Sequence, residues 1–153
     1  MSTTLFNAQP YDEAKARRRR IWIAVSIIAV IAIATLFWFN RYWPQERRVN
    51  HFFAQLQAKN YEGAYGVWMN DPNWKQHPDT YKRYPFHAFY LDWGPGGEWG
   101  TVRSYKIVAA QKPRPDANGV VVGVRVNDRK SLCSVRVEFN DGTLGFSPDE
   151  MVE

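Results

Sequence analysis

The stretch from Val120 to Phe139 reads VVVGVRVNDRKSLCSVRVEF and contains the clearest periodic pattern in the chain. Every second residue from Val120 to Val126 is valine, and another alternating set begins after the turn residues Asn127-Asp128. That second set is Cys133, Val135, Val137 and Phe139, with Ser134, Arg136 and Glu138 on the opposite face. Alternating β-branched residues predict two antiparallel strands with one packed face and one solvated face.

The flanking sequence extends this sheet in both directions. A further strand is predicted over 104–110, and a short last strand over 143–146. The connections at 113–119 and at Asp141-Gly142 are rich in proline, glycine, asparagine and aspartate, which are turn formers. We therefore expect a curved, mainly antiparallel sheet of four strands.

Three segments upstream of the sheet share a helical pattern. Apolar residues recur in each at i, i+3, i+4 and i+7, which predicts three amphipathic helices. The first is expected from about Gln45, just after Pro44, to Lys59, and the third ends before Gly94. The three apolar sets are Val49, Phe52, Phe53 and Leu56; Tyr61, Ala64, Tyr65 and Trp68; and Phe86, Phe89, Tyr90 and Trp93. Three helices followed by four strands predict an α+β fold with the helices packed on one face of the sheet.

This order of elements resembles the nuclear transport factor 2-like superfamily, the cystatin-like α+β cone, over about residues 45–150. The resemblance rests on Phe52-Phe53-x-x-Leu56, on Tyr61-Glu62-x-Ala64-Tyr65-x-x-Trp68, on Phe89-Tyr90-Leu91-Asp92-Trp93-Gly94 and on the strand series. It implies an aromatic-lined pocket, in which enzymatic members of the superfamily place an Asp, His or Tyr. The corresponding pocket candidates here are Tyr65, Trp68, His87, Tyr90, Asp92 and Trp93.

The pattern of the third helix argues against catalysis at this pocket. A buried Asp92 could act as a base with a raised pKa, but both His87 and Asp92 fall outside the inward stripe. We therefore expect them at the surface or bonded to a helix end, and assign no catalytic residue. Trp68 and Trp93 are expected in the core. Trp74 and Trp99, on predicted loops, are candidates for exposed contacts.

Neither a metal nor another cofactor is indicated. His51, His77 and His87 lack the spacing of metal ligands. Cys133 is the only cysteine, which excludes an intramolecular disulfide, and its place among the alternating valines predicts a buried side chain.

The N-terminal part contains a 19-residue apolar run, IWIAVSIIAVIAIATLFWF, from Ile21 to Phe39. Its length matches the hydrocarbon core of a bilayer, so we expect a transmembrane helix, followed by an interfacial linker at 40–44 and an extracytoplasmic domain at 45–153. The arginines of the basic tail at 1–20 favour a cytoplasmic N-terminus. The alternative is a cleaved signal peptide, because Ala32-Ile33-Ala34 resembles a cleavage site.

The excess positive charge belongs to this anchor. The net charge is +5, but six lysines and arginines face only two acidic residues before Pro44, against fourteen facing thirteen after it. Nucleic-acid binding needs a basic surface on the folded domain, so it is not expected here.

The layout of short basic tail, one span and one cone-like domain resembles inner-membrane scaffold subunits of type IV secretion and proteins associated with lipid import. It implies a single-pass protein of the bacterial inner membrane that binds or scaffolds, with the bilayer and an envelope protein or a second copy as partners. The alternatives are a pocket enzyme of the isomerase or dehydratase type, and a non-catalytic pocket for a small ligand or lipid.

Overall fold

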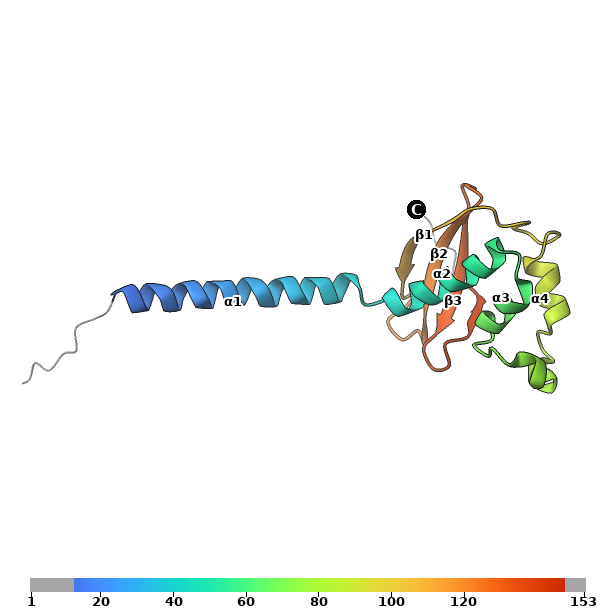
Figure 1. Ribbon diagram of the computed structural model, residues 1–153, viewed down its shortest axis with the longest axis horizontal. Coiled ribbons are helices and arrows are strands. Elements are labelled where there is room, and N and C mark those ends of the chain that lie inside the picture. Colours follow the sequence, from blue (N-terminus) through green and yellow to red (C-terminus); the bar gives the residue numbers. More distant parts are fainter. Residues whose placement is uncertain (1–12, 148–153) are drawn as a thin grey trace, which may run out of the picture. The chain divides into compact units, whose positions relative to one another are not determined.

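The computed structural model describes residues 13–147. The chain divides into two compact units between Arg41 and Tyr42, which are described separately below. Figure 1 shows the elements of both units coloured along the sequence.

The first unit is the single helix α1 (Glu13–Phe39), in which no residue is buried. It is long and apolar enough to cross a bilayer, although a signal sequence would have the same character. The hydroxyls of Ser26 and Thr35 each donate a hydrogen bond of 2.8 Å to the carbonyl four residues earlier, so these polar groups are satisfied within the helix. The helix begins eight residues before the predicted span, so the end of the basic tail is helical.

The second unit begins with helices and ends with strands, as predicted (Figure 1). Its elements are α2 (Trp43–Gln57), α3 (Tyr61–Trp68), η1 (Trp74–Gln76), η2 (Pro78–Tyr81), α4 (Phe86–Trp93), β1 (Tyr105–Gln111), β2 (Gly119–Val126), β3 (Leu132–Glu138) and β4 (Leu144–Phe146). The three α-helices and four strands match the predicted segments to within two residues at each end. The two short 3₁₀ helices, η1 and η2, were not predicted, because they are organised by tertiary contacts described below.

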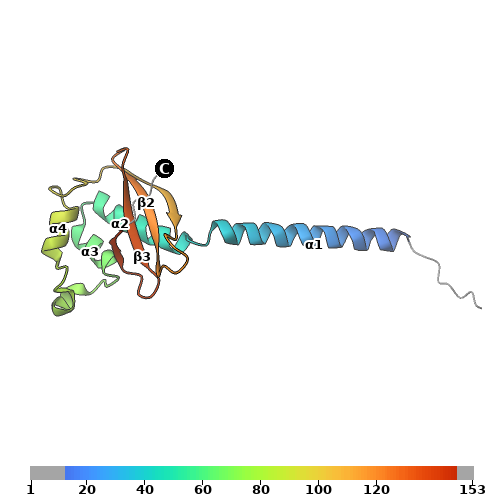
Figure 2. The same ribbon diagram turned by 180° about the vertical axis from the view of Figure 1, so that it is seen from behind.

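The strands form an open antiparallel sheet in the order β1-β2-β3-β4 (Figure 2). The register places the valines of β2 opposite Val137, Val135 and Cys133 of β3, so the predicted inward sets coincide. Asn127 and Asp128 both have positive φ, of 51° and 55°, as their prediction as turn residues requires. Two expectations were wrong. Phe139 lies just beyond β3 and is 42% exposed, and Val121, on the face of β2 expected to be solvated, is 1% exposed.

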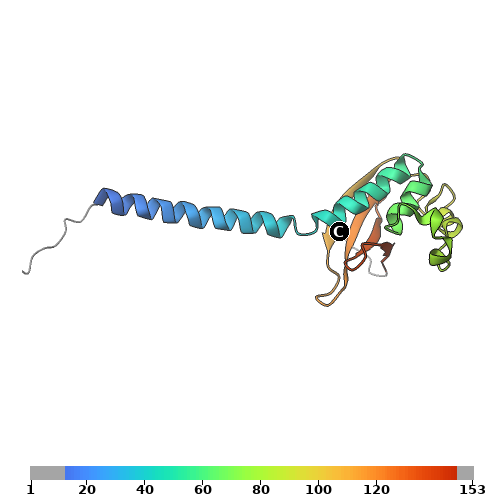
Figure 3. The same ribbon diagram turned by 60° about the horizontal axis from the view of Figure 1, so that its bottom comes forward.

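The helices cover the sheet unequally. Helix α2 contacts β1, β2 and β3, whereas α3 reaches β4 and packs against α2 (Figure 3). Helix α4 packs mainly on α3 and meets the sheet through Trp93, whose ring stacks on Phe146 at 5.8 Å. The layer predicted as three helices on one sheet face is therefore α2 on the sheet, with α3 and α4 beside it.

Aromatic rings fill the space between helices and sheet. Phe52 is fully buried and lies 5.1 Å from Trp68 and 5.0 Å from Trp93, measured between ring centroids. Phe53 and Phe89 are also fully buried beside it, at 5.2 Å and 6.1 Å. The interior, where the superfamily resemblance predicts a pocket, is thus occupied by side chains.

Candidate functional site

Three of the predicted pocket residues are core residues. Tyr65, Trp68 and Trp93 are 1%, 3% and 2% exposed and belong to the main hydrophobic cluster. The Tyr65 hydroxyl donates a 2.6 Å hydrogen bond to the carbonyl of Tyr84, which satisfies its polar group. These side chains fill the interior instead of lining a cavity within it.

The other three predicted pocket residues, His87, Tyr90 and Asp92, are on the surface. The Asp92 carboxylate accepts a 2.7 Å hydrogen bond from the Tyr84 hydroxyl. Burial raises the pKa of Tyr84, and the bond to Asp92 raises it further, so this tyrosine keeps its proton. The structure therefore does not bring the six predicted residues together around one cavity.

An open groove with a volume of about 870 Å³ lies between α2 and α3. Its α2 side is formed by Pro44, Arg47, Arg48, Asn50, His51, Ala54 and Gln55, and its other side by Asn60, Glu62, Gly63, Gly66, Val67, Asn70 and Pro72. None of the six predicted pocket residues lines it. The groove was missed because a polar stripe on an amphipathic helix has the same sequence pattern as an ordinary solvated face.

Two of the residues that line the groove, Arg48 and Asn70, are bonded to the β3–β4 turn. Arg48 Nη1 donates to the carbonyl of Gly142 at 2.7 Å, and Asn70 Nδ2 donates to the carbonyl of Asp141 at 2.7 Å. Gly142 has a φ of +68°, a backbone conformation that strains most side chains, so glycine is favoured at this position. These contacts bind the sheet to both helices and position the Arg48 guanidinium.

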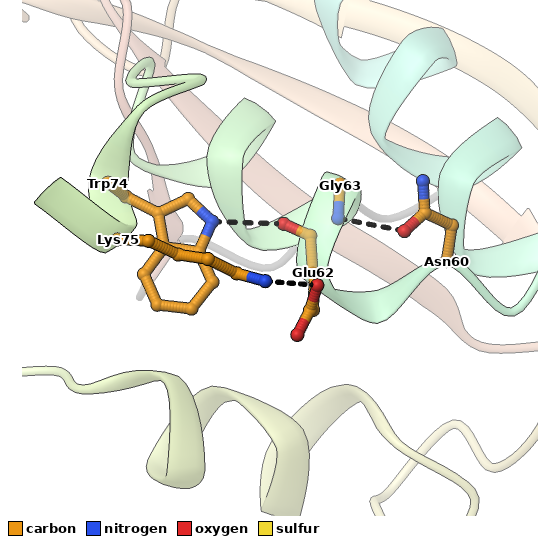
Figure 4. Close-up of polar contacts among 5 residues, drawn as sticks. All are labelled: Asn60, Glu62, Gly63, Trp74 and Lys75. Atoms are coloured by element: carbon orange, nitrogen blue, oxygen red, sulfur yellow. Dashed lines mark hydrogen bonds and ion pairs between the residues drawn. The ribbon is translucent and has the colours of Figure 1, made fainter.

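Other residues that line the groove lie around the start of α3 (Figure 4). Asn60 Oδ1 accepts from the backbone N–H of Gly63 at 3.0 Å, which caps the helix. Glu62 pairs with Lys75 at 2.6 Å, and its carbonyl accepts from Trp74 Nε1 at 3.2 Å. A second hollow of about 360 Å³ lies here, and it shares Asn60, Glu62, Gly63 and Pro72 with the groove.

The wall beyond α3 is a strap, residues 71–84, which contains η1 and η2. Asp71 organises it: one carboxylate oxygen accepts from Tyr81 Oη at 2.7 Å and lies 2.9 Å from His77 Nδ1, and the other accepts from the Asn73 N–H at 2.8 Å. The bonds from His77 and Tyr81 lower the pKa of Asp71, while burial and Asp71 raise the pKa of Tyr81 to about 12. No sequence motif predicted this cluster, because its members become neighbours only when the strap folds.

The two tryptophans predicted as contact residues are half-buried. Trp74 packs against Tyr65 at 4.8 Å and stacks on Phe86 at 5.2 Å, which holds the strap onto the core. Trp99 lies beneath the guanidinium of Arg129, with 5.5 Å from Cζ to the ring centroid. Both residues therefore have clear structural roles.

Cys133 is buried, and burial raises the pKa of its thiol to about 12. Within residues 13–147, no three His, Cys, Asp or Glu side chains are grouped so that they could hold a metal ion. The groove presents hydrogen-bond donors and acceptors from two helices, and it is open to solvent. Such a surface is suited to holding a polypeptide segment.

Comparison of the chain with protein-family models, with curated proteins and with solved structures found no match.

Proposed function

We propose that this protein is a single-pass, membrane-anchored binding or scaffold subunit of a bacterial envelope, and that the α2–α3 groove receives a polypeptide segment of its partner. The observation that carries the proposal is the contrast between a filled interior and an open groove lined by both polar and apolar residues. Helix α1 supplies the anchor, with the N-terminus in the cytoplasm and the domain outside it.

The enzyme alternative has less support. An isomerase or dehydratase site needs a cavity with an inward carboxylate or imidazole. Here Phe52, Trp68 and Trp93 occupy the interior, and Asp92 and His87 are exposed. A non-catalytic pocket for a small apolar ligand or a lipid would need the same empty space, so it is disfavoured by the same packing.

The groove has features that select a polypeptide over a compact ligand. It is open to solvent, and its lining runs from Arg48 to the amides of Gln55 and Asn60. A Cβ at Gly63 would meet the terminal amide groups of Asn60 and Gln55, so a larger residue here would displace both side chains. The partner segment would place an acidic group beside Arg48 and hydrogen-bond the amides, by charge complementarity.

The partner can be another protein or a second copy of the chain. The order of helices and strands supports a cone-like α+β domain of the kind that the resemblance to the nuclear transport factor 2-like superfamily implies. The cone of this chain would be a filled one, whose binding surface lies outside.

Site-specific photo-crosslinking in intact cells tests the groove. A photoreactive residue at Glu62, which faces the groove and is exposed, should give a discrete adduct from the full-length chain. The matched control is the same residue at Lys106, which is exposed on β1. Val67→Trp, which fills the groove, should remove the adduct. Equal labelling at Glu62 and Lys106, or an adduct that survives Val67→Trp, would overturn the assignment.

The anchor and its orientation need their own test. Carbonate at high pH should leave the full chain in the membrane pellet and detergent should release it, because α1 is held by the hydrocarbon core. A C-terminal alkaline phosphatase fusion should be active and a green fluorescent protein fusion dark. Fluorescence without phosphatase activity would reverse the topology, and a cleaved N-terminus would replace the anchor by a signal peptide.

A further inference from the structure

Helix α2 has a second stripe besides the one that packs on the sheet. The buried stripe is Val49, Phe52, Phe53 and Leu56. On the opposite side lie Trp43, Arg47, His51 and Ala54, spaced at i, i+4, i+8 and i+11, which places them along one face of the helix. We call these four residues the outer stripe.

The first residue of the outer stripe, Trp43, is a large aromatic residue that does not pack in the core. Trp43 is 53% exposed and lies outside the hydrophobic cluster. The guanidinium of Arg47 lies over its ring, with Cζ 5.2 Å from the centroid. An exposed tryptophan paired with an arginine at the start of an amphipathic helix is the combination found at the interface of a bilayer.

The neighbouring sequence repeats this combination. Arg41 lies 4.4 Å above the ring of Trp38 at the end of α1, so an aromatic–arginine pair stands on each side of residue 42. Only three residues separate Phe39, the last residue of α1, from Trp43. The outer stripe contains two basic residues, Arg47 and His51, and no acidic one.

We propose that the outer stripe binds anionic phospholipid headgroups, with Arg47 on the phosphate oxygens and Trp43 in the headgroup layer, so that α2 holds the domain on the bilayer surface. A guanidinium suits this ligand because its N–H groups match phosphate oxygens in pairs. The inference rests on α1 crossing a bilayer, which belongs to the proposed function. Arg47, His51 and Ala54 also line the α2 side of the groove, so headgroups would cover that edge, while Arg48, Gln55 and the α3 side stay open to a protein partner.

Electron paramagnetic resonance of the full chain in lipid nanodiscs tests this proposal. Cys133→Ser removes the only cysteine, and His51→Cys carries a nitroxide on the outer stripe while Arg47 and Trp43 remain. The matched control places the label at Lys106, on the exposed side of β1. Discs of phosphatidylcholine are compared with discs that also contain phosphatidylglycerol, and the ratio of immobilised to mobile label is measured.

The immobilised fraction at position 51 should rise with phosphatidylglycerol, and the label at 106 should not change. Arg47→Gln should lower the immobilised-to-mobile ratio about fivefold, the effect of one basic residue near an anionic surface. One molar salt should lower it too, because the Debye length is then about 3 Å. Trp43→Ala should lower it in both lipid mixtures.

Three outcomes would overturn the proposal. The first is a mobile label at position 51 in both kinds of disc. The second is an immobilised fraction at position 51 that changes neither with phosphatidylglycerol nor in Arg47→Gln. The third is immobilisation that appears only when an acidic peptide or a partner protein is added, which would assign the stripe to a protein. A chain that does not incorporate into discs would instead contradict the anchor, so the two failures are distinct.

Discussion

Replacing Phe52 by alanine tests whether the interior of the domain is closely packed. The side chain is fully buried, and its burial contributes about 1.5–3 kcal/mol. Its ring also contacts Phe53, Trp68, Phe89 and Trp93 at centroid distances of 5.0–6.1 Å. At about 0.5 kcal/mol each, the lower bound for such pairs, these contacts bring the expected loss of unfolding free energy to roughly 3.5–5 kcal/mol.

The assay is urea denaturation of the full chain in detergent micelles, followed by near-ultraviolet circular dichroism of the aromatic core. Phe52→Leu, which keeps most of the volume, should cost about 1.5 kcal/mol. Leu91→Ala is the control, because Leu91 is 59% exposed and its loss should stay within about 0.5 kcal/mol. A small apolar probe such as benzene should stabilise Phe52→Ala and leave the wild type unchanged.

Two results would contradict a closely packed interior. A loss below about 1 kcal/mol for Phe52→Ala would mean that the ring is not at the centre of a tightly packed core. Stabilisation of the wild-type chain by the apolar probe would show an interior cavity, and it would restore the enzyme and ligand-pocket alternatives.

Three further predictions concern single groups. The pKa of Asp71 is held below its ordinary 3.8 by bonds from His77 and Tyr81, so the stability that the ionised carboxylate contributes is present above pH 3.8 and is lost as the pH falls through the lower folded value. Urea midpoints measured from pH 5 to 2 should therefore fall more steeply for the wild type than for Asp71→Asn. Parallel curves for the two proteins would contradict this. Because burial raises the pKa of Cys133 to about 12, N-ethylmaleimide at pH 8 should leave the thiol of the native protein unmodified and should label it in urea, as measured by mass spectrometry. Rapid labelling of the native protein would show that β3 opens. Asn60→Ala should lower the free energy of unfolding by about 1 kcal/mol in the same denaturation assay, because it removes the cap bond to Gly63, and Asn60→Asp should restore that stability. An equal loss in both variants would assign the effect to another contact.

The secondary structure of this protein is largely local in origin. Each element was predicted from a pattern within its own segment. These patterns are the alternating valines of β2, the i, i+3, i+4, i+7 sets of the three domain helices and the apolar run of α1. Even the turn at Asn127 followed from residue type, although its side chain also accepts from the N–H groups of Arg103 and Ser104 at 2.8 and 3.3 Å, which no local pattern indicates.

The prediction of site residues was less successful, for a physical reason. Tyr65, Trp68 and Trp93 were correctly placed on inward faces, but an inward face cannot distinguish a residue that lines a pocket from one that fills it. That distinction depends on how closely rings from separate elements approach, as in the stacking of Trp93 on Phe146.

Sequence alone therefore determined the apolar helix α1, the α+β order of the domain and the burial of the two valine-rich strand faces, because each depends on side-chain periodicity within one segment. Tertiary structure decided that the interior is filled, that Phe139 is exposed and that Arg48 and Asn70 fasten the β3–β4 turn beside a groove. Those features arise from contacts between residues up to 94 positions apart, and only the folded chain sets the distances between them.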